Sequence, residues 1–117
     1  MFRFEKFDVW QKAIAWADLV YRVTQSFPTD ERFGLTNQMR RAAVSVSSNI
    51  AEGCSRTSDR DFARFVEVSY GSLLEVVSQC HIAKNQNFLA PDDFELIVAE
   101  AEQLARMLSA LKSRLKS

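Results

Sequence analysis

Apolar residues recur every three or four positions along four separate stretches of the chain, and this spacing favours an all-α fold. The clearest stretch keeps heptad spacing over three repeats, at Phe94, Ile97, Ala101, Leu104, Leu108, Leu111 and Leu115. The first stretch follows the same rule at Val9, Ala13, Trp16, Val20, Val23 and Phe27. Only three Gly and two Pro occur in 117 residues, which leaves little room for strands and turns. We therefore predict one domain, residues 1–117, folded as an antiparallel up-down-up-down four-helix bundle.

Capping residues and helix breakers predict where the first two helices begin and end. Asp8 is the expected N-cap of the first helix, and Pro28 is expected to close it. Residues 1–7 form an extended N-terminal arm, whose three phenylalanines we expect to pack on the bundle or on a neighbouring subunit. The second helix is predicted from about residue 35 to about residue 54, with Gly53 in a left-handed conformation at its end.

The third and fourth helices carry similar signals. Ser58 followed by Asp61 resembles a capping box, and the third helix is predicted to run from there to about Asn87. Gly71 in the middle of this helix, next to a serine, suggests a close contact with another helix. Pro91 suits the first position of the fourth helix, because its missing N–H would have no partner there.

The second helix has an unusual polar stripe beside its apolar one, formed by Gln38, Arg41, Ser45, Asn49 and Glu52. Short Ser and Asn side chains are poor helix formers because they compete for backbone hydrogen bonds, so this cluster needs a reason. We favour small residues that let another helix approach closely, with Arg41 and Glu52 pairing across turns or chains. A polar network that contacts a partner is the alternative. A second apolar stripe on the first helix, including Ile14 and Tyr21, is a further hint of an oligomer.

The chain is neutral, with fifteen basic and fifteen acidic side chains, but its charges are unevenly distributed. Residues 32–64 hold six arginines and three acids, whereas residues 92–102 hold five acids and no base. Arginine binds phosphate well and in a bidentate manner. The candidates for nucleic-acid binding are Arg40, Arg41, Arg56, Arg60 and Arg64. The alternative is that Asp61 and Glu67, three residues on either side of Arg64, neutralise it.

Catalytic, metal and cofactor sites find no support in the residue pattern. His81 is the only histidine, and its neighbour Cys80 would point about 100° away from it on a helix. A di-iron site needs two Glu-x-x-His motifs, and no phosphate-binding glycine loop or nucleophile elbow occurs. We expect no enzymatic activity, no cofactor and no small-molecule substrate. With two unpatterned cysteines, no signal peptide and no 18-residue apolar run, we also expect a soluble cytoplasmic protein without membrane contact.

A family resemblance extends over about residues 7–115. It rests on the string QMRRAAVSVSSNIAEG, which FPTDERFGL precedes and SDRDFARFVEVSYGSLLE follows. The chain resembles the family encoded in intervening sequences of bacterial 23S rRNA genes, whose members are often labelled as ribosomal proteins. The resemblance implies a four-helix bundle that assembles as a ring-shaped homopentamer. The signature falls on Gln38, Arg40, Arg41, Ser45, Asn49, Glu52 and Gly53, and it brings no catalytic role.

This family is similar to the accessory protein of diversity-generating retroelements, a basic pentameric bundle that binds nucleic acid and a reverse transcriptase. The present chain differs in being neutral. From the local excess of arginine and from the resemblance, the main hypothesis is a non-enzymatic homo-oligomeric scaffold that contacts RNA or a ribonucleoprotein through arginines. The alternative is a protein-interaction adaptor with no nucleic-acid binding, in which Gln38, Ser45, Asn49 and Glu52 serve subunit packing.

Overall fold

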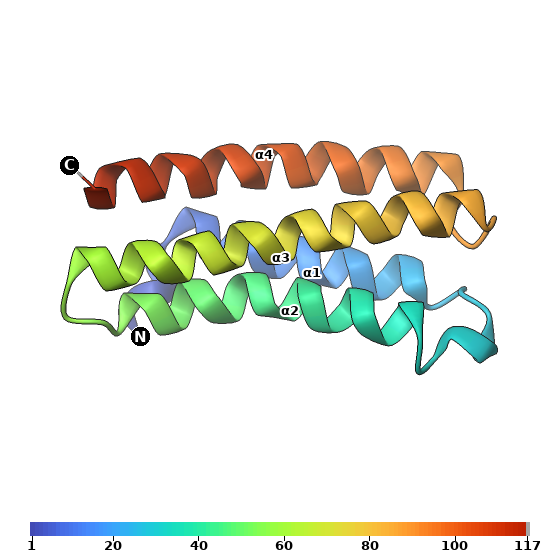
Figure 1. The fold of residues 1–117 in the computed structure, drawn as a ribbon, viewed down its shortest axis with the longest axis horizontal. Coiled ribbons are helices and arrows are strands. Elements are labelled where there is room, and N and C mark those ends of the chain that lie inside the picture. Colours follow the sequence, from blue (N-terminus) through green and yellow to red (C-terminus); the bar gives the residue numbers. More distant parts are fainter. Residues whose placement is uncertain (117) are drawn as a thin grey trace.

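Four long α-helices run antiparallel along one axis in the computed structural model, which describes residues 1–116 (Figure 1). The helices are α1 Asp8–Thr24, α2 Leu35–Cys54, α3 Asp59–Asn85 and α4 Pro91–Lys116, with short 3-10 helices η1 Arg3–Lys6 and η2 Thr29–Glu31. No strand occurs among the described residues. The predicted all-α four-helix bundle is thus confirmed. None of the described helices combines the length and hydrophobicity that a membrane crossing would require.

The apolar stripes form the core of the bundle, as their spacing predicts. All six members of the first-helix stripe are buried, and so are Ile97, Ala101, Leu104, Leu108 and Leu111 of α4. The largest core side chain, Trp16, also has a polar partner, because its indole Nε1 donates to the backbone oxygen of Ile97 at 3.2 Å. This bond ties α1 to α4, and the ion pair between Lys12 and Glu100 joins the same two helices nearer the surface.

The predicted ends of α1 are wrong at both sides. Asp8 is the first helical residue rather than the cap, and Phe7 precedes it in an extended conformation without a side-chain cap. The carboxylate of Asp8 still lies in the first turn, where the helix dipole favours negative charge. At the other end α1 stops at Thr24, because the N–H of Phe27 turns back to bond the Thr24 oxygen at 3.1 Å. Pro28 therefore lies beyond a turn that has already ended the helix.

The N-terminal arm is a 3-10 turn rather than an extended segment. The backbone N–H of Phe2 donates to Glu5 Oε1 at 2.8 Å, and this bond closes the turn. Phe4 packs edge-on against Trp10 at 5.0 Å, and Phe7 stacks against Phe62 at 6.2 Å between ring centroids. These two aromatics pack on the bundle as expected, whereas Phe2 keeps 75% of its surface exposed.

The predicted starts of α3 and α4 are confirmed. Ser58 caps α3, since its Oγ accepts a hydrogen bond from the Asp61 N–H at 3.1 Å. Pro91 is the first residue of α4. The third helix ends at Asn85, slightly earlier than expected, and Asn87 follows with a φ of 64°. Asparagine tolerates this left-handed conformation better than most residues, which suits the tight connection to α4.

The predicted roles of the two helical glycines are wrong. Gly53 lies inside α2, and no glycine of the described chain has a positive φ. Its function is steric, because a Cβ on Gly53 would lie 2.7 Å from Phe65 Cβ of α3. Gly71, in contrast, is exposed, and a Cβ there would meet nothing within 4 Å. The close approach of α2 and α3 is therefore made at Gly53, whereas Gly71 faces open space.

Candidate functional site

The polar stripe of α2 faces α3 and is used within one chain. Ser45 Oγ lies 2.9 Å from Ser72 Oγ of α3, and Asn49 Nδ2 donates to both the backbone oxygen and the Oγ of Ser45. Gln38 accepts a weak hydrogen bond, 3.4 Å long, from the buried Gln79 of α3. These contacts agree with the interpretation that small polar residues let another helix approach. Ser45 and Gln38 of the stripe therefore take part in the contact between α2 and α3.

Arg40 and Arg41, adjacent in the sequence, face different neighbours of α2. Arg40 Nε donates to Thr24 Oγ1 at 2.8 Å, and its guanidinium lies over the Tyr21 ring at 4.7 Å. Arg40 therefore serves the contact between α1 and α2 and does not join the other arginines at one surface. Arg41 is exposed on the α3 side of α2, beside Ser45 and near neither Arg60 nor Arg64.

Arg56 is also engaged with its surroundings. Its guanidinium forms an ion pair with Glu52 at 3.3 Å and lies 4.6 Å from the centroid of the Phe65 ring. Within one chain the expected pairing of Glu52 with Arg41 is therefore wrong, because Glu52 pairs instead with Arg56, one helical turn away. This pair is exposed to solvent, where such contacts contribute little stability.

Arg60 and Arg64 make no hydrogen bond or ion pair within residues 1–116. The expected neutralisation of Arg64 by Glu67 is wrong, because Glu67 instead bonds Lys112 at 3.1 Å and Lys116 at 3.6 Å. The hydrogen bond and charge of Lys112, with the charge of Lys116, hold the pKa of Glu67 below its ordinary value of 4.5. Helix packing thus brings the C-terminal lysines of α4 to the arginines of α3.

We call Arg60, Arg64, Lys112 and Lys116 the basic edge. Arg60, Arg64 and Lys116 line a groove of about 450 Å³ together with Ala63, Glu67 and Leu115. Lys112 and Lys116 were not among the residues predicted from the sequence, although one signal for them was present. No acidic residue follows Glu102, whereas four bases do, namely Arg106, Lys112, Arg114 and Lys116.

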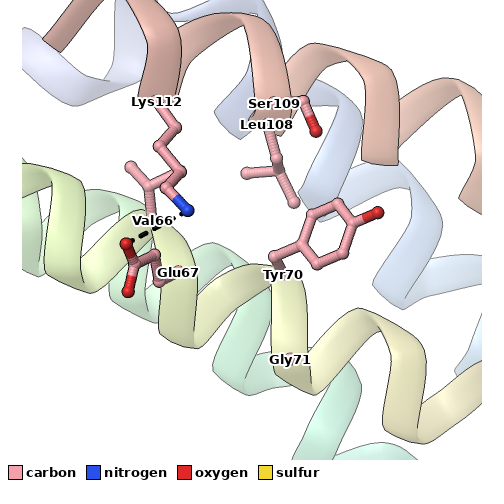
Figure 2. A pocket seen from close by; sticks show the side chains of 7 residues that line it. All are labelled: Val66, Glu67, Tyr70, Gly71, Leu108, Ser109 and Lys112. Atoms are coloured by element: carbon pink, nitrogen blue, oxygen red, sulfur yellow. Dashed lines mark ion pairs between the residues drawn. The ribbon is translucent and has the colours of Figure 1, made fainter. Parts of the chain in front are cut away.

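A second hollow of about 330 Å³ adjoins the basic edge between α3 and α4 (Figure 2). We call it the Tyr70 hollow; it is lined by Val66, Glu67, Tyr70, Gly71, Leu108, Ser109 and Lys112. Figure 2 shows the ion pair of Glu67 and Lys112 on one side and the Tyr70 ring on the other. The hollow therefore joins a charged rim to an apolar and aromatic floor.

The bundle is 43 Å long, and its two ends carry different clusters of charged residues. Both chain ends, the end of α2 and the start of α3 lie at the same end of the bundle, and the basic edge is there (Figure 1). The opposite end carries acids of η2 and the first turn of α4, including Asp30, Glu31, Asp92 and Asp93. Both ends are mixed in charge, because Asp59 and Asp61 lie beside Arg60 at the first end and Arg32 lies next to Glu31 at the other.

Cys80 and His81, the two residues considered for chemistry, are neighbours in the sequence but have different surroundings. His81 is exposed, with its ring 4.9 Å from the Phe94 ring. Cys80 is buried, and burial raises the pKa of its thiol to about 12. No group of three or more His, Cys, Asp or Glu side chains within residues 1–116 is placed to hold a metal ion.

Comparison with known proteins agrees with the fold and the resemblance. The family model described as 23S rRNA-intervening sequence protein matches residues 5–110. A crystal structure of a protein of unknown function from the S23 ribosomal protein family, from Bacteroides thetaiotaomicron, superposes with a TM-score of 0.82. It is 16% identical, and the match covers 90% of this chain and 95% of that one, so it supports the fold alone. No curated protein matches the sequence.

Proposed function

Because the chain belongs to the 23S rRNA-intervening sequence protein family, we propose that it is a non-enzymatic scaffold that associates with RNA through its basic edge. The observation that carries the proposal is the position of Arg60 and Arg64. Their guanidinium groups have no acidic partner among residues 1–116, and Lys116 lines the same groove. Guanidinium and ammonium groups in one groove are suited to successive phosphates of a nucleic-acid backbone.

The basic edge also accounts for how a neutral chain can bind RNA. Non-specific affinity depends on the phosphates that are neutralised locally, and distant acids are screened beyond about 8 Å at physiological salt. If all four side chains of the basic edge contact phosphates, log K should fall with log salt at a slope of about −3.

We further propose that the protein assembles with copies of itself, and the family resemblance implies five subunits. A ring would repeat the basic edge on every subunit, so that weak contacts act together on one RNA. Sedimentation velocity of the purified protein tests this part directly. A sedimentation coefficient of a monomer across the working concentration range would contradict it.

Fluorescence anisotropy of a labelled structured rRNA fragment, at low and near-physiological salt, tests RNA binding. The variant R60Q/R64Q/K116Q should lose most of the affinity at low salt. A matched control, R22Q/R32Q/R41Q, removes the same charge from other surfaces and should bind nearly as well as the unmodified protein. Equal loss in both variants would mean that net charge alone matters, and no binding by the unmodified protein would refute the proposal.

A protein-interaction adaptor is the second candidate, and exposed apolar side chains on α1 and α2 favour it. Ile14, Tyr21 and Val44 are 36%, 42% and 41% exposed, respectively, and a partner that packs on α1 and α2 would cover them. Under this hypothesis I14D/V44D changes the assembly state, and the protein shows no RNA binding at any salt. Unchanged assembly in that variant would count against the adaptor.

A further inference from the structure

Tyr70 stands between two hollows on the outer surface of α3 and α4. The ring is half-buried and projects from α3 toward Leu108 and Ser109 of α4 (Figure 2). The Tyr70 hollow lies on the side of the basic edge, and a mainly apolar hollow of about 270 Å³, toward Leu74 and Val98, lies on the other side. Open space therefore borders the ring on two flanks, which is unlike an aromatic ring sealed in a core.

The polar groups around the Tyr70 hollow are available to a ligand. Neither the Tyr70 hydroxyl nor the Ser109 hydroxyl has a hydrogen-bond partner within the described part of the chain. Gly71 has no side chain, so it leaves its side of the hollow open, and a Cβ there would meet nothing within 4 Å. The floor is formed by apolar groups such as Val66 and Leu108. A flat heterocycle with polar edges matches this combination of aromatic ring, apolar floor and free hydroxyls.

The charge around the hollow favours an anionic chain as the ligand. Glu67 is at its mouth, but Lys112 and Lys116 both bond this carboxylate, so the three groups together remain positive. The adjoining groove adds Arg60 and Arg64, four residues and therefore about 6 Å apart along α3. Proteins that bind single strands combine such a positive groove with aromatic side chains on which bases stack.

We propose that the groove between α3 and α4 binds single-stranded RNA, with one unstacked base against Tyr70 and the neighbouring phosphates on Arg60, Arg64 and Lys116. This inference rests on the proposed function and names the form of RNA that the same edge takes. Duplex RNA keeps its bases paired and stacked, so it offers the basic edge its phosphates but cannot place a base in the hollow.

The test compares three labelled probes on the full-length protein by fluorescence anisotropy. They are a short unstructured RNA, an abasic strand with the same number of phosphates, and a hairpin duplex. We expect the unstructured RNA to bind about 5-fold to 150-fold more tightly than the abasic strand, the range for stacking one base. Y70L should abolish this difference without weakening the abasic strand, whereas Y70F should keep it.

A second variant tests whether the effect of Y70L on RNA binding comes from a disturbed fold. Gly71 lines the hollow at an exposed position, and a Cβ there would meet nothing within 4 Å, so G71L should bring an apolar side chain to the hollow while its thermal unfolding is unaltered or raised. G71L should also abolish the preference for the unstructured RNA over the abasic strand. Its sedimentation coefficient should equal that of the unmodified protein.

The outcomes separate this inference from the proposed function. If the abasic strand binds as tightly as the unstructured RNA and Y70L has no effect, the base contact is refuted. Loss of binding in R60Q/R64Q/K116Q would then still support the proposed function. If no probe binds at low salt, both are refuted. If G71L changes the sedimentation coefficient, another copy of the chain occupies the hollow, and the inference is overturned.

Discussion

Gly53 of α2 and Phe65 of α3 approach so closely that a methyl group on the glycine would lie 2.7 Å from Phe65 Cβ. The aromatic ring of Phe62 is also near, with its Cδ1 at 2.9 Å. Only a residue without a side chain lets the two helices meet here. The same contact holds the Phe65 side chain beneath the guanidinium of Arg56. Gly53 thus determines the spacing of α2 and α3 at the end of the bundle where the basic edge lies.

Substitution of Gly53 by alanine should therefore destabilise the protein. Alanine favours the helix by about 1 kcal/mol over glycine, but the overlap with Phe65 Cβ forces the helices apart. We expect the free energy of unfolding to fall by about 1–3 kcal/mol, the usual cost of overpacking. Urea unfolding followed by circular dichroism measures it. The matched control is G71A, which should raise the free energy of unfolding by about 0.5–1 kcal/mol. Equal effects of the two substitutions would contradict the steric argument.

The adjacent residues Arg40 and Arg41 should differ sharply in their contribution to stability. R40A removes the hydrogen bond to Thr24 and the contact with the Tyr21 ring, so the free energy of unfolding should fall by about 1–2 kcal/mol. R41A removes an exposed side chain with no ion pair in residues 1–116 and should change it by less than about 0.5 kcal/mol. Chemical denaturation of both variants decides the point. A larger effect of R41A would mean that Arg41 is used in assembly.

Glu67 should make stability depend on pH in the acid range. Its pKa is lower in the folded chain than the ordinary 4.5, so the folded state favours the charged carboxylate. This contribution is present above pH 4.5 and is lost as the pH falls through the folded pKa. E67Q should therefore flatten the decline of the melting temperature below pH 4.5. High salt should reduce the difference between the two proteins, because the pair is exposed. Identical acid profiles would contradict the pairing.

Cys80 should resist thiol reagents while the protein is folded. The thiolate is the reactive form, and burial raises the Cys80 pKa to about 12. In C54S only this thiol remains, and labelling at pH 8 should require unfolding of the chain. In C80S the half-buried Cys54 should label faster under the same conditions. Mass spectrometry of timed samples gives both rates. Rapid labelling of C54S under native conditions would show that α3 opens locally near Cys80.

The helices themselves could be predicted from the sequence because their signals are local. Helical periodicity predicts the buried faces. The N-cap of α3 is also local, because Ser58 accepts a hydrogen bond from the backbone N–H of Asp61, three residues later. The bounds of α2 and the start of α4 at Pro91 agree with the structure for this reason. The error at Gly53 arises where a contact from another helix decides which residue is tolerated. Gly53 has the sequence features of a helix C-terminus, but Phe65 of the next helix explains its presence.

The amino-acid sequence by itself determined the four amphipathic helices, their order and the even balance of charge. Only the tertiary structure decided which arginines remain unpaired. Arg40 is held by Thr24 of α1, and Glu67 turns from Arg64 to lysines of α4. The physical reason is how far along the chain the interacting groups lie from each other. Backbone hydrogen bonds and burial periodicity act within one or two helical turns, so they can be read along the chain. Ion pairs between helices depend on how far each helix is rotated about its axis, which only packing of the whole bundle sets.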